Sequence, residues 1–183
     1  MRRRRVQLAA VVAVAGLLGV VGAAVAGGGS RDVREHLKGY EEVPSVSTTG
    51  VGEFRAKVRD SKIDYTISWS NLEGDITQSH IHFGQEAVNG GISAFLCYTT
   101  QTVPEGTPKC EGARTGTASG TIEPSDVIGP AGPGGAPGGQ GIRPGEYNEL
   151  LRAIRAGVTY ANVHSTVFPG GEVRAQLDRD HDR

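Results

Sequence analysis

The chain has 183 residues, of which 28 are glycine, 5% are aromatic and 21% are charged, with a formal net charge of −1. This length suits one domain with a sizeable core and is too short for two ordinary domains. The composition is not dominated by Ala, Glu, Lys, Leu and Arg, which excludes a coiled coil. Because no basic excess would neutralise phosphates, we expect no nucleic-acid partner.

The N-terminus has the pattern of a secretory signal peptide. Four arginines at positions 2–5 precede an apolar run over residues 6–26, which ends in Ala-Val-Ala. A positive segment, an apolar segment and a small-residue cleavage site are typical of such signals, so residues 1–26 are predicted to be removed after Ala26. The alternative is an uncleaved anchor, because the apolar run approaches the length that spans a bilayer.

The remainder of the chain is mildly acidic. Residues 27–183 contain 15 basic and 20 acidic residues, a formal net charge of −5, and no second apolar run of membrane-spanning length. We therefore expect a secreted protein, extracellular or in the cell envelope, with no membrane contact beyond the signal segment. Within it we expect a disordered segment over 27–36, a β domain over 37–178 and a charged tail over 179–183.

Cys97 and Cys110 are the two cysteines of the chain, and both lie in the part expected to be exported. In an oxidising compartment such a pair is expected to form a structural disulfide. The bridge would close a loop of about 14 residues, worth roughly 3 kcal/mol in the chain-entropy description. A redox-active pair is the alternative, and the spacing disfavours it because it is not Cys-x-x-Cys.

Alternation of apolar and polar residues predicts antiparallel strands through most of the chain. The first two are expected to form a hairpin, and the next two another hairpin with a type I′ turn at Asn89-Gly90. The predicted strands cover residues 53–59, 63–70, 79–87, 91–98, 115–122, 159–166 and 171–178.

Two segments interrupt this pattern. Residues 129–145 contain eight glycines and four prolines and are expected to form a flexible loop. Residues 146–156 carry an apolar stripe at helical spacing and are followed by Gly157, a favourable residue after a helix end. These elements together indicate an all-β fold: an antiparallel, Greek-key-like β-sandwich or barrel of about seven or eight strands, with one short helix before the last two strands.

Three histidines are candidate metal ligands. His80 and His82 lie two residues apart on one face of a predicted strand, and His164 lies on a later strand. If those strands are neighbours and Ile81 and Val163 enter the core, the three imidazoles would converge on the other face of the sheet. Three imidazoles on a rigid sheet suit Cu or Zn. The alternative is that these histidines bond loop backbone and orient it.

Apart from these histidines, the sequence contains no motif of a common enzyme class. No serine lies in a nucleophile elbow, no glycine-rich stretch has the setting of a phosphate loop, and no carboxylate pair is fixed at a working distance. No catalytic residue is therefore predicted, and we expect a protein without enzymatic activity.

Four stretches, in this order, resemble motifs of the CHRD domain family, the module named after the extracellular protein chordin. They are LKGYEEVP (37–44), SHIHFG (79–84) followed by Asn-Gly (89–90), LLRAIRAG (150–157), and YANVH (160–164) followed by PGGEVR (169–174). The chain departs from the family pattern at Ser165, where Thr is usual, and at Ala175, where Gly is usual. The motif residues singled out by this resemblance are Glu42, Pro44, Gly84, Asn162, Gly170, Glu172 and Arg174.

The resemblance implies an extracellular β-rich module without an established catalytic activity. We therefore expect an exported, non-enzymatic binding module for an extracellular protein or a cell-envelope component. One alternative is a Cu or Zn domain that uses His80, His82 and His164, with superoxide-dismutase-like redox activity. It is suggested by analogy, since the copper ligands of Cu,Zn superoxide dismutases also include a His-x-His strand and a later Val-His strand. Another alternative is a structural module without a discrete site.

Overall fold

The structure is a computed structural model that describes residues 30–132 and 138–177. The predicted signal segment and the predicted charged tail lie outside these residues. None of the helices in the described ranges is both long and apolar enough to cross a membrane.

Nine strands form one sheet in the order β5-β4-β8-β9-β1-β2-β3-β7-β6, and every pairing of neighbouring strands is antiparallel. The strands are β1 (Arg31–Lys38), β2 (Val51–Val58), β3 (Ile63–Ser70), β4 (Ile76–Phe83), β5 (Gly91–Tyr98), β6 (Glu111–Gly112), β7 (Gly116–Ile122), β8 (Thr159–Ser165) and β9 (Val173–Gln176). The helices are α1 (Tyr147–Arg155) and two 3₁₀ turns, η1 (Gly39–Glu41) and η2 (Pro124–Asp126).

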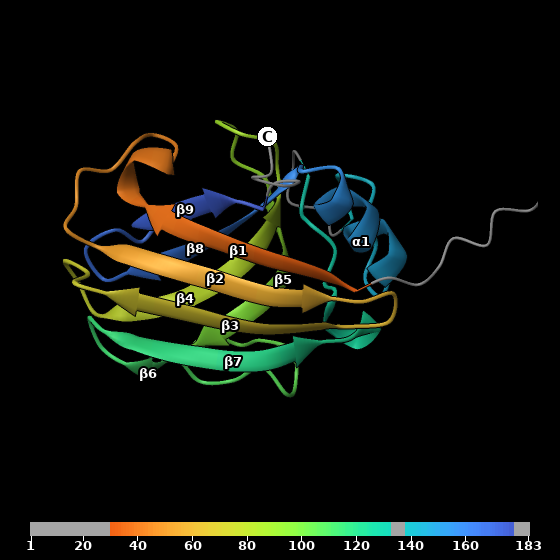
Figure 1. The fold of residues 1–183 in the computed structure, drawn as a ribbon, viewed down its shortest axis with the longest axis horizontal. Helices are drawn as coiled ribbons and strands as arrows, with labels where there is room; N and C mark the ends of the chain where they lie inside the picture. Colours follow the sequence, from red (N-terminus) through yellow and green to blue (C-terminus); the bar gives the residue numbers. More distant parts are fainter. Residues whose placement is uncertain (1–29, 133–137, 178–183) are drawn as a thin grey trace, which may run out of the picture.

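The sheet curls into a half-barrel. Strands β1, β2, β3 and β7 form a layer in front of β9, β8, β4 and β5 (Figure 1), and β5 approaches β7 across the interior. The apolar core lies between the two layers and includes Phe54, Ile67 and Trp69 from one side and Ile81 and Val163 from the other. The predicted all-β fold is therefore confirmed, with nine strands and one short helix before the last two.

Local sequence accounts for these elements. In β2, Phe54, Ala56 and Val58 are buried while the alternating charged residues face solvent, as expected for a half-buried strand. The predicted helix is present as α1, which turns its apolar residues inward, and Gly157 follows its end with φ +70°. That left-handed backbone conformation suits glycine at a helix end.

The N-terminal edge of the domain differs from the prediction. Residues 31–36, expected to be disordered, belong to β1, which pairs along its whole length with β2. Val33, Glu35 and Leu37 alternate inward and are buried there. The strand was not predicted because a glutamate, Glu35, occupies one of its three inward positions.

The connection between β4 and β5 also differs. β4 ends at Phe83, so the connection spans residues 84–90 and is not a two-residue turn. Among the described residues of this loop, the left-handed conformation occurs at Ala87, so the type I′ turn at Asn89-Gly90 is wrong. Gly90 is required for another reason, because a Cβ there would lie 1.8 Å from the Phe83 carbonyl oxygen.

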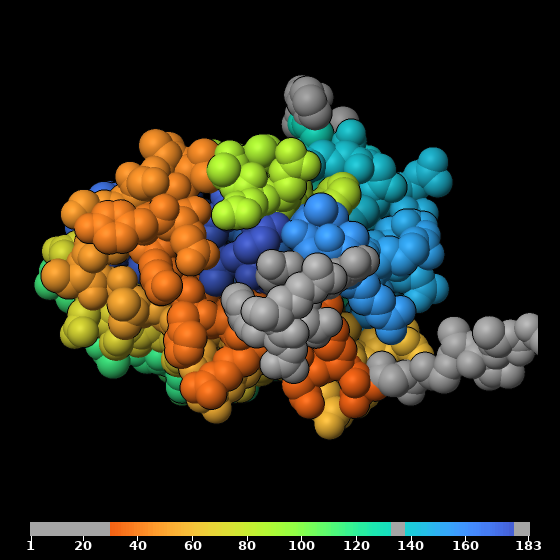
Figure 2. Space-filling model, turned by 45° about the horizontal axis from the view of Figure 1, so that its top comes forward, coloured from red at the N-terminus to blue at the C-terminus, as the bar shows by residue number. Residues whose placement is uncertain are grey.

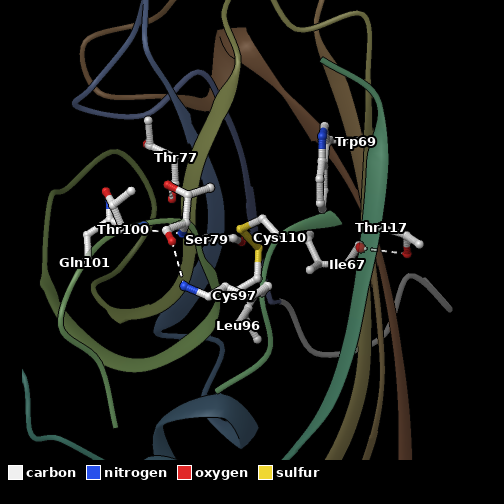
Figure 3. The surroundings of a disulfide bond; sticks show 12 residues. Ile67, Trp69, Thr77, Ser79, Leu96, Cys97, Thr100, Gln101, Cys110 and Thr117 are labelled. Carbon is white, nitrogen blue, oxygen red and sulfur yellow. Dashed lines mark hydrogen bonds between the residues drawn. A yellow bond between two sulfur atoms is a disulfide. The ribbon is translucent and has the colours of Figure 1, made fainter. Parts of the chain in front are cut away.

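The predicted disulfide is present (Figure 3). It joins Cys97 in β5 to Cys110, directly before β6, with the Cα atoms 5.0 Å apart. Tyr98 and Lys109 also form a parallel β-bridge there, and the Cys110 amide donates to the Tyr98 carbonyl at 2.9 Å. Since β5 and β6 are the two edges of the sheet, the disulfide links its two ends.

Candidate functional site

The histidine-bearing strands β4 and β8 are neighbours, as convergence of the three histidines requires. In their register His80 pairs with Asn162, His82 with Tyr160, and Gln78 with His164. Because residues alternate between the faces of a strand, these polar residues lie on the face opposite to the apolar core. That face is not exposed, since all seven residues of β8 are buried.

Loops cover the polar face. The 84–90 loop lies over it from one side, because the Gly90 carbonyl bonds His82. The connection between β8 and β9 lies over it from another, because the Pro169 carbonyl bonds His164. Asn89 donates to the Val43 carbonyl at 2.9 Å and so ties the first loop to the segment after η1. The histidines are therefore enclosed, with His80 at 0% exposure.

The three imidazoles converge. The ring centroid of His80 lies 5.3 Å from that of His82 and 4.8 Å from that of His164. The ring centroids of His82 and His164 are 6.3 Å apart. One potential ligand atom from each of the three residues lies within 4.8 Å of the other two. Imidazole nitrogens bind Zn at about 2.0–2.1 Å, so two ligands of one ion are at most about 4.2 Å apart, and the rings would have to draw slightly closer together to share one ion.

The backbone sets the tautomers of two of these rings. The Nδ1 atoms of His82 and His164 lie 2.9 Å from the carbonyl oxygens of Gly90 and Pro169. A carbonyl can only accept, so both Nδ1 atoms carry hydrogen and both Nε2 atoms keep a lone pair. Such an outer hydrogen bond is usual for metal-binding histidines because it fixes the ring and its tautomer.

Several ring nitrogens are buried without a hydrogen-bond partner. Within the described part of the chain, this holds for His82 Nε2 and for both ring nitrogens of His80. His80 instead makes T-shaped contacts with the rings of His164 and Phe95. Leaving a buried donor or acceptor unpaired costs about 1–3 kcal/mol. The hydrogen bonds within the cluster and to its surroundings therefore leave these ring nitrogens at an energetic cost.

Burial keeps the histidines neutral. It is the largest cause that lowers the pKa of His82 to about 4, and it also lowers the pKa of His164. The pKa of His80 is lowered well below its ordinary value, first by burial and then by the two neighbouring histidines. A neutral imidazole with a free lone pair is the form that binds a metal.

Asn162 connects the histidines to a buried carboxyl group. Its side-chain amide lies 3.1 Å from His164 Nε2 and also interacts with the Glu42 carboxyl, whose pKa it lowers. Burial raises the pKa of Glu42 to about 7, against the opposing effects of Arg174 and Asn162.

Tyr160 and Arg174 extend the site beyond the metal candidates. The Tyr160 ring stacks on His82 at 4.6 Å and 2°, and the guanidinium carbon of Arg174 lies 3.4 Å from the Tyr160 ring centroid. Since β8 lies between β4 and β9, Tyr160 stands between the other two side chains. Tyr160 was not among the site residues predicted from the sequence, although it alternates with Asn162 and His164 along β8.

The family-motif residues fall into separate groups. Glu42, Asn162 and Arg174 gather beside the histidines, and Pro44 follows a cis peptide bond in the same region. Glu172 lies apart and accepts hydrogen bonds from the Thr48 hydroxyl and the Glu73 amide, both at 2.7 Å. Arg174 and Glu172 lie outside the apolar core but are almost fully buried.

The motif glycines have unequal roles. At Gly84 a Cβ would lie 3.0 Å from the Tyr160 ring, which explains a small residue there. At Gly170 no described atom lies within 4 Å of such a Cβ. The neighbouring Gly171 has φ +127°, and a Cβ there would lie 2.4 Å from Glu42 Oε1, so it is the glycine that this connection needs.

Comparison with known proteins finds one family. The model of the CHRD domain matches residues 33–177, nearly all of the described domain. No curated protein and no solved structure matches the chain.

Proposed function

The chain belongs to the CHRD domain family, and on that premise we propose that it is a binding module whose ligand is a copper or zinc ion held by His80, His82 and His164. The observation that carries the proposal is the set of unpaired, buried imidazole nitrogens in a cluster whose candidate ligand atoms lie within 4.8 Å of one another. Three imidazole ligands suit both metals and leave a coordination position for a further ligand.

A purely structural role for the histidines explains less. It accounts for the Nδ1 bonds of His82 and His164 to backbone carbonyls. It does not account for His80, which is fully buried and bonds no loop within the described residues. A metal ion would pair His80 and His82 Nε2 together and so remove the cost of burying them.

Metal analysis tests the proposal. Purified protein is stripped with a chelator, incubated with Cu(II) or Zn(II), freed of excess metal and analysed for metal content and melting temperature. We expect about one ion per chain, and a stabilisation of about 2.7 kcal/mol when free metal is a hundredfold above Kd. For Cu(II), the electron paramagnetic resonance spectrum should show nitrogen coupling from imidazole ligands.

Histidine variants locate the site. H80A, H82A and H164A should each lose the bound ion, whereas H36A should keep it, because the His36 side chain is 64% exposed and lies outside the cluster. If one of these histidine variants fails to fold, the spectrum of the Cu(II)-loaded native protein still shows whether imidazoles bind the ion. Native protein that takes up neither metal, with an unchanged melting temperature, would overturn the proposal.

We further propose that the protein is exported, in agreement with its predicted signal segment. The Cys97–Cys110 disulfide is compatible with an oxidising compartment, and CHRD domains are typically extracellular. Binding of an extracellular protein or a cell-envelope component stays a prediction alongside the metal site.

A further inference from the structure

A surface cavity lies next to the histidine cluster but is separate from it. It has a volume of about 640 Å³. Three parts of the chain surround it: η1 and the residues after it, the 84–90 loop, and β9. Figure 2 shows this region, with the dark-blue β9 between orange η1 and the light-green loop. Three buried charged residues line it: Glu35, Glu42 and Arg174.

Arg174 is a buried cation without a paired carboxylate. Its side chain is 1% exposed, and it forms no salt bridge with any residue that the structure describes. Nη2 donates to the carbonyl oxygens of Gln85 and Val88 at 3.2 and 3.1 Å. Nη1 is buried and lacks a partner in the described ranges.

Such an arrangement favours an anionic ligand. A buried charge is costly unless it is paired, and burial is the largest cause that lowers the pKa of Arg174 from its ordinary value. The guanidinium is planar and directs its N–H donors as a carboxylate requires, and here the donors of Nη1 are unused. The ring of Tyr160 and the two loop carbonyls hold this guanidinium in place.

We propose that this cavity binds a small monocarboxylate, which accepts a hydrogen bond from Arg174 Nη1 and extends its organic part along the segment after η1. The charges around the cavity support a monoanion. Its lining carries three cations, Arg34, Lys38 and Arg174, and four glutamates, which are Glu35, Glu41, Glu42 and Glu86. A polyanion would therefore meet repulsion from the glutamates, whereas a single negative charge can pair with Arg174 while Glu42 is protonated.

The two proposed sites are distinct. Tyr160 separates Arg174 from His82, so a carboxylate on Nη1 is not a ligand of an ion held by the histidines. The experiment therefore uses metal-free protein, and its outcome does not depend on metal binding.

A nuclear magnetic resonance titration tests this site. ¹⁵N-labelled metal-free protein is titrated with sodium acetate, and a second sample with sodium chloride at equal ionic strength. We expect saturable shifts with acetate for amides of the 84–90 loop, η1 and β9. R174K, which keeps the charge but loses the planar fork, should weaken acetate binding at least about tenfold.

Arg34 provides the matched control. It also lines the cavity, but its side chain is 60% exposed and paired with Glu53, so R34K should leave acetate binding unchanged. If R174K does not fold, the location of the shifts in the native protein decides. Equal effects of chloride and acetate, shifts away from this cavity, or undiminished binding by folded R174K would each overturn the proposal.

Discussion

Glu42 shows how burial sets the behaviour of a single side chain. It is 5% exposed, it interacts with Asn162, and its Oε1 has no hydrogen-bond partner among the described residues. Burial raises its pKa from 4.5 to about 7, so the folded protein binds the proton of Glu42 more tightly than the unfolded chain does. The stability that this proton brings is fully present below pH 4.5 and is lost as the pH rises to about 7.

E42Q is therefore expected to become more stable than the native protein as the pH rises. Glutamine has the shape of the protonated carboxyl group and does not titrate. From pH 4.5 to pH 8 the difference in unfolding free energy should grow in favour of E42Q by about 3 kcal/mol, since one pKa unit is worth about 1.4 kcal/mol. Urea unfolding of both metal-free proteins across this range measures it. A difference that does not vary with pH would contradict the prediction.

For single residues, the sequence predicted which side chains form the candidate site better than it predicted what surrounds them. The spacing of His80, His82 and His164 predicted a convergent set, and the structure brings the three together. Their enclosure was not predictable, because it depends on loops whose paths come from contacts such as that between Asn89 and the Val43 carbonyl. The stack of Arg174 on Tyr160 likewise depends on the adjacency of β8 and β9.

Among the elements, the 84–90 loop contributes most to the site. Its Gly90 carbonyl orients His82, and its Gln85 and Val88 carbonyls accept from Arg174. The sequence predicted a hairpin at this place but not the length of its loop. The Asn-Gly pair suggested a tight turn, whereas the glycine is needed for close approach to the Phe83 carbonyl.

G90A should therefore disturb both proposed sites. The new Cβ would lie 1.8 Å from a backbone oxygen, which cannot give way without moving the loop. We expect a loss of about 1–3 kcal/mol in stability, as for other overpacked positions, together with weaker metal binding. Chemical denaturation and metal titration measure the two effects.

The matched control is G170A, in the other covering loop. No described atom lies within 4 Å of its Cβ, so it should change stability by less than about 0.5 kcal/mol. Equal behaviour of G90A and G170A would show that the close approach at Gly90 carries no energetic weight.

For the molecule as a whole, the disulfide joins the two edges of the sheet, which no strand pairing joins. The strand order begins at β5 and ends at β6, and Cys97 and Cys110 join the two ends (Figure 3). The sequence predicted the covalent bond from compartment and spacing. It could not predict that the bond links sheet edges, because strand order depends on contacts between distant segments.

Removal of both cysteines should lower stability without changing the fold. For C97S/C110S we expect a loss of about 3 kcal/mol, the chain-entropy value for a loop of about 14 residues. The far-ultraviolet circular dichroism spectrum should stay that of a β protein while the melting temperature falls. Reduction of the native protein should give the same drop, and an unchanged melting temperature in both experiments would contradict the structural role.

The pairing of β4 with β8 has a consequence for biosynthesis. His82 and His164 come from segments far apart in the chain, and the β9 residue Arg174 comes still later. A nascent chain that ends before β8 holds two of the three histidines and none of the backbone that orients the third. The histidine cluster can therefore assemble only when almost the whole domain has been synthesised. If the chain is exported unfolded, it must take up any metal in the compartment where it folds.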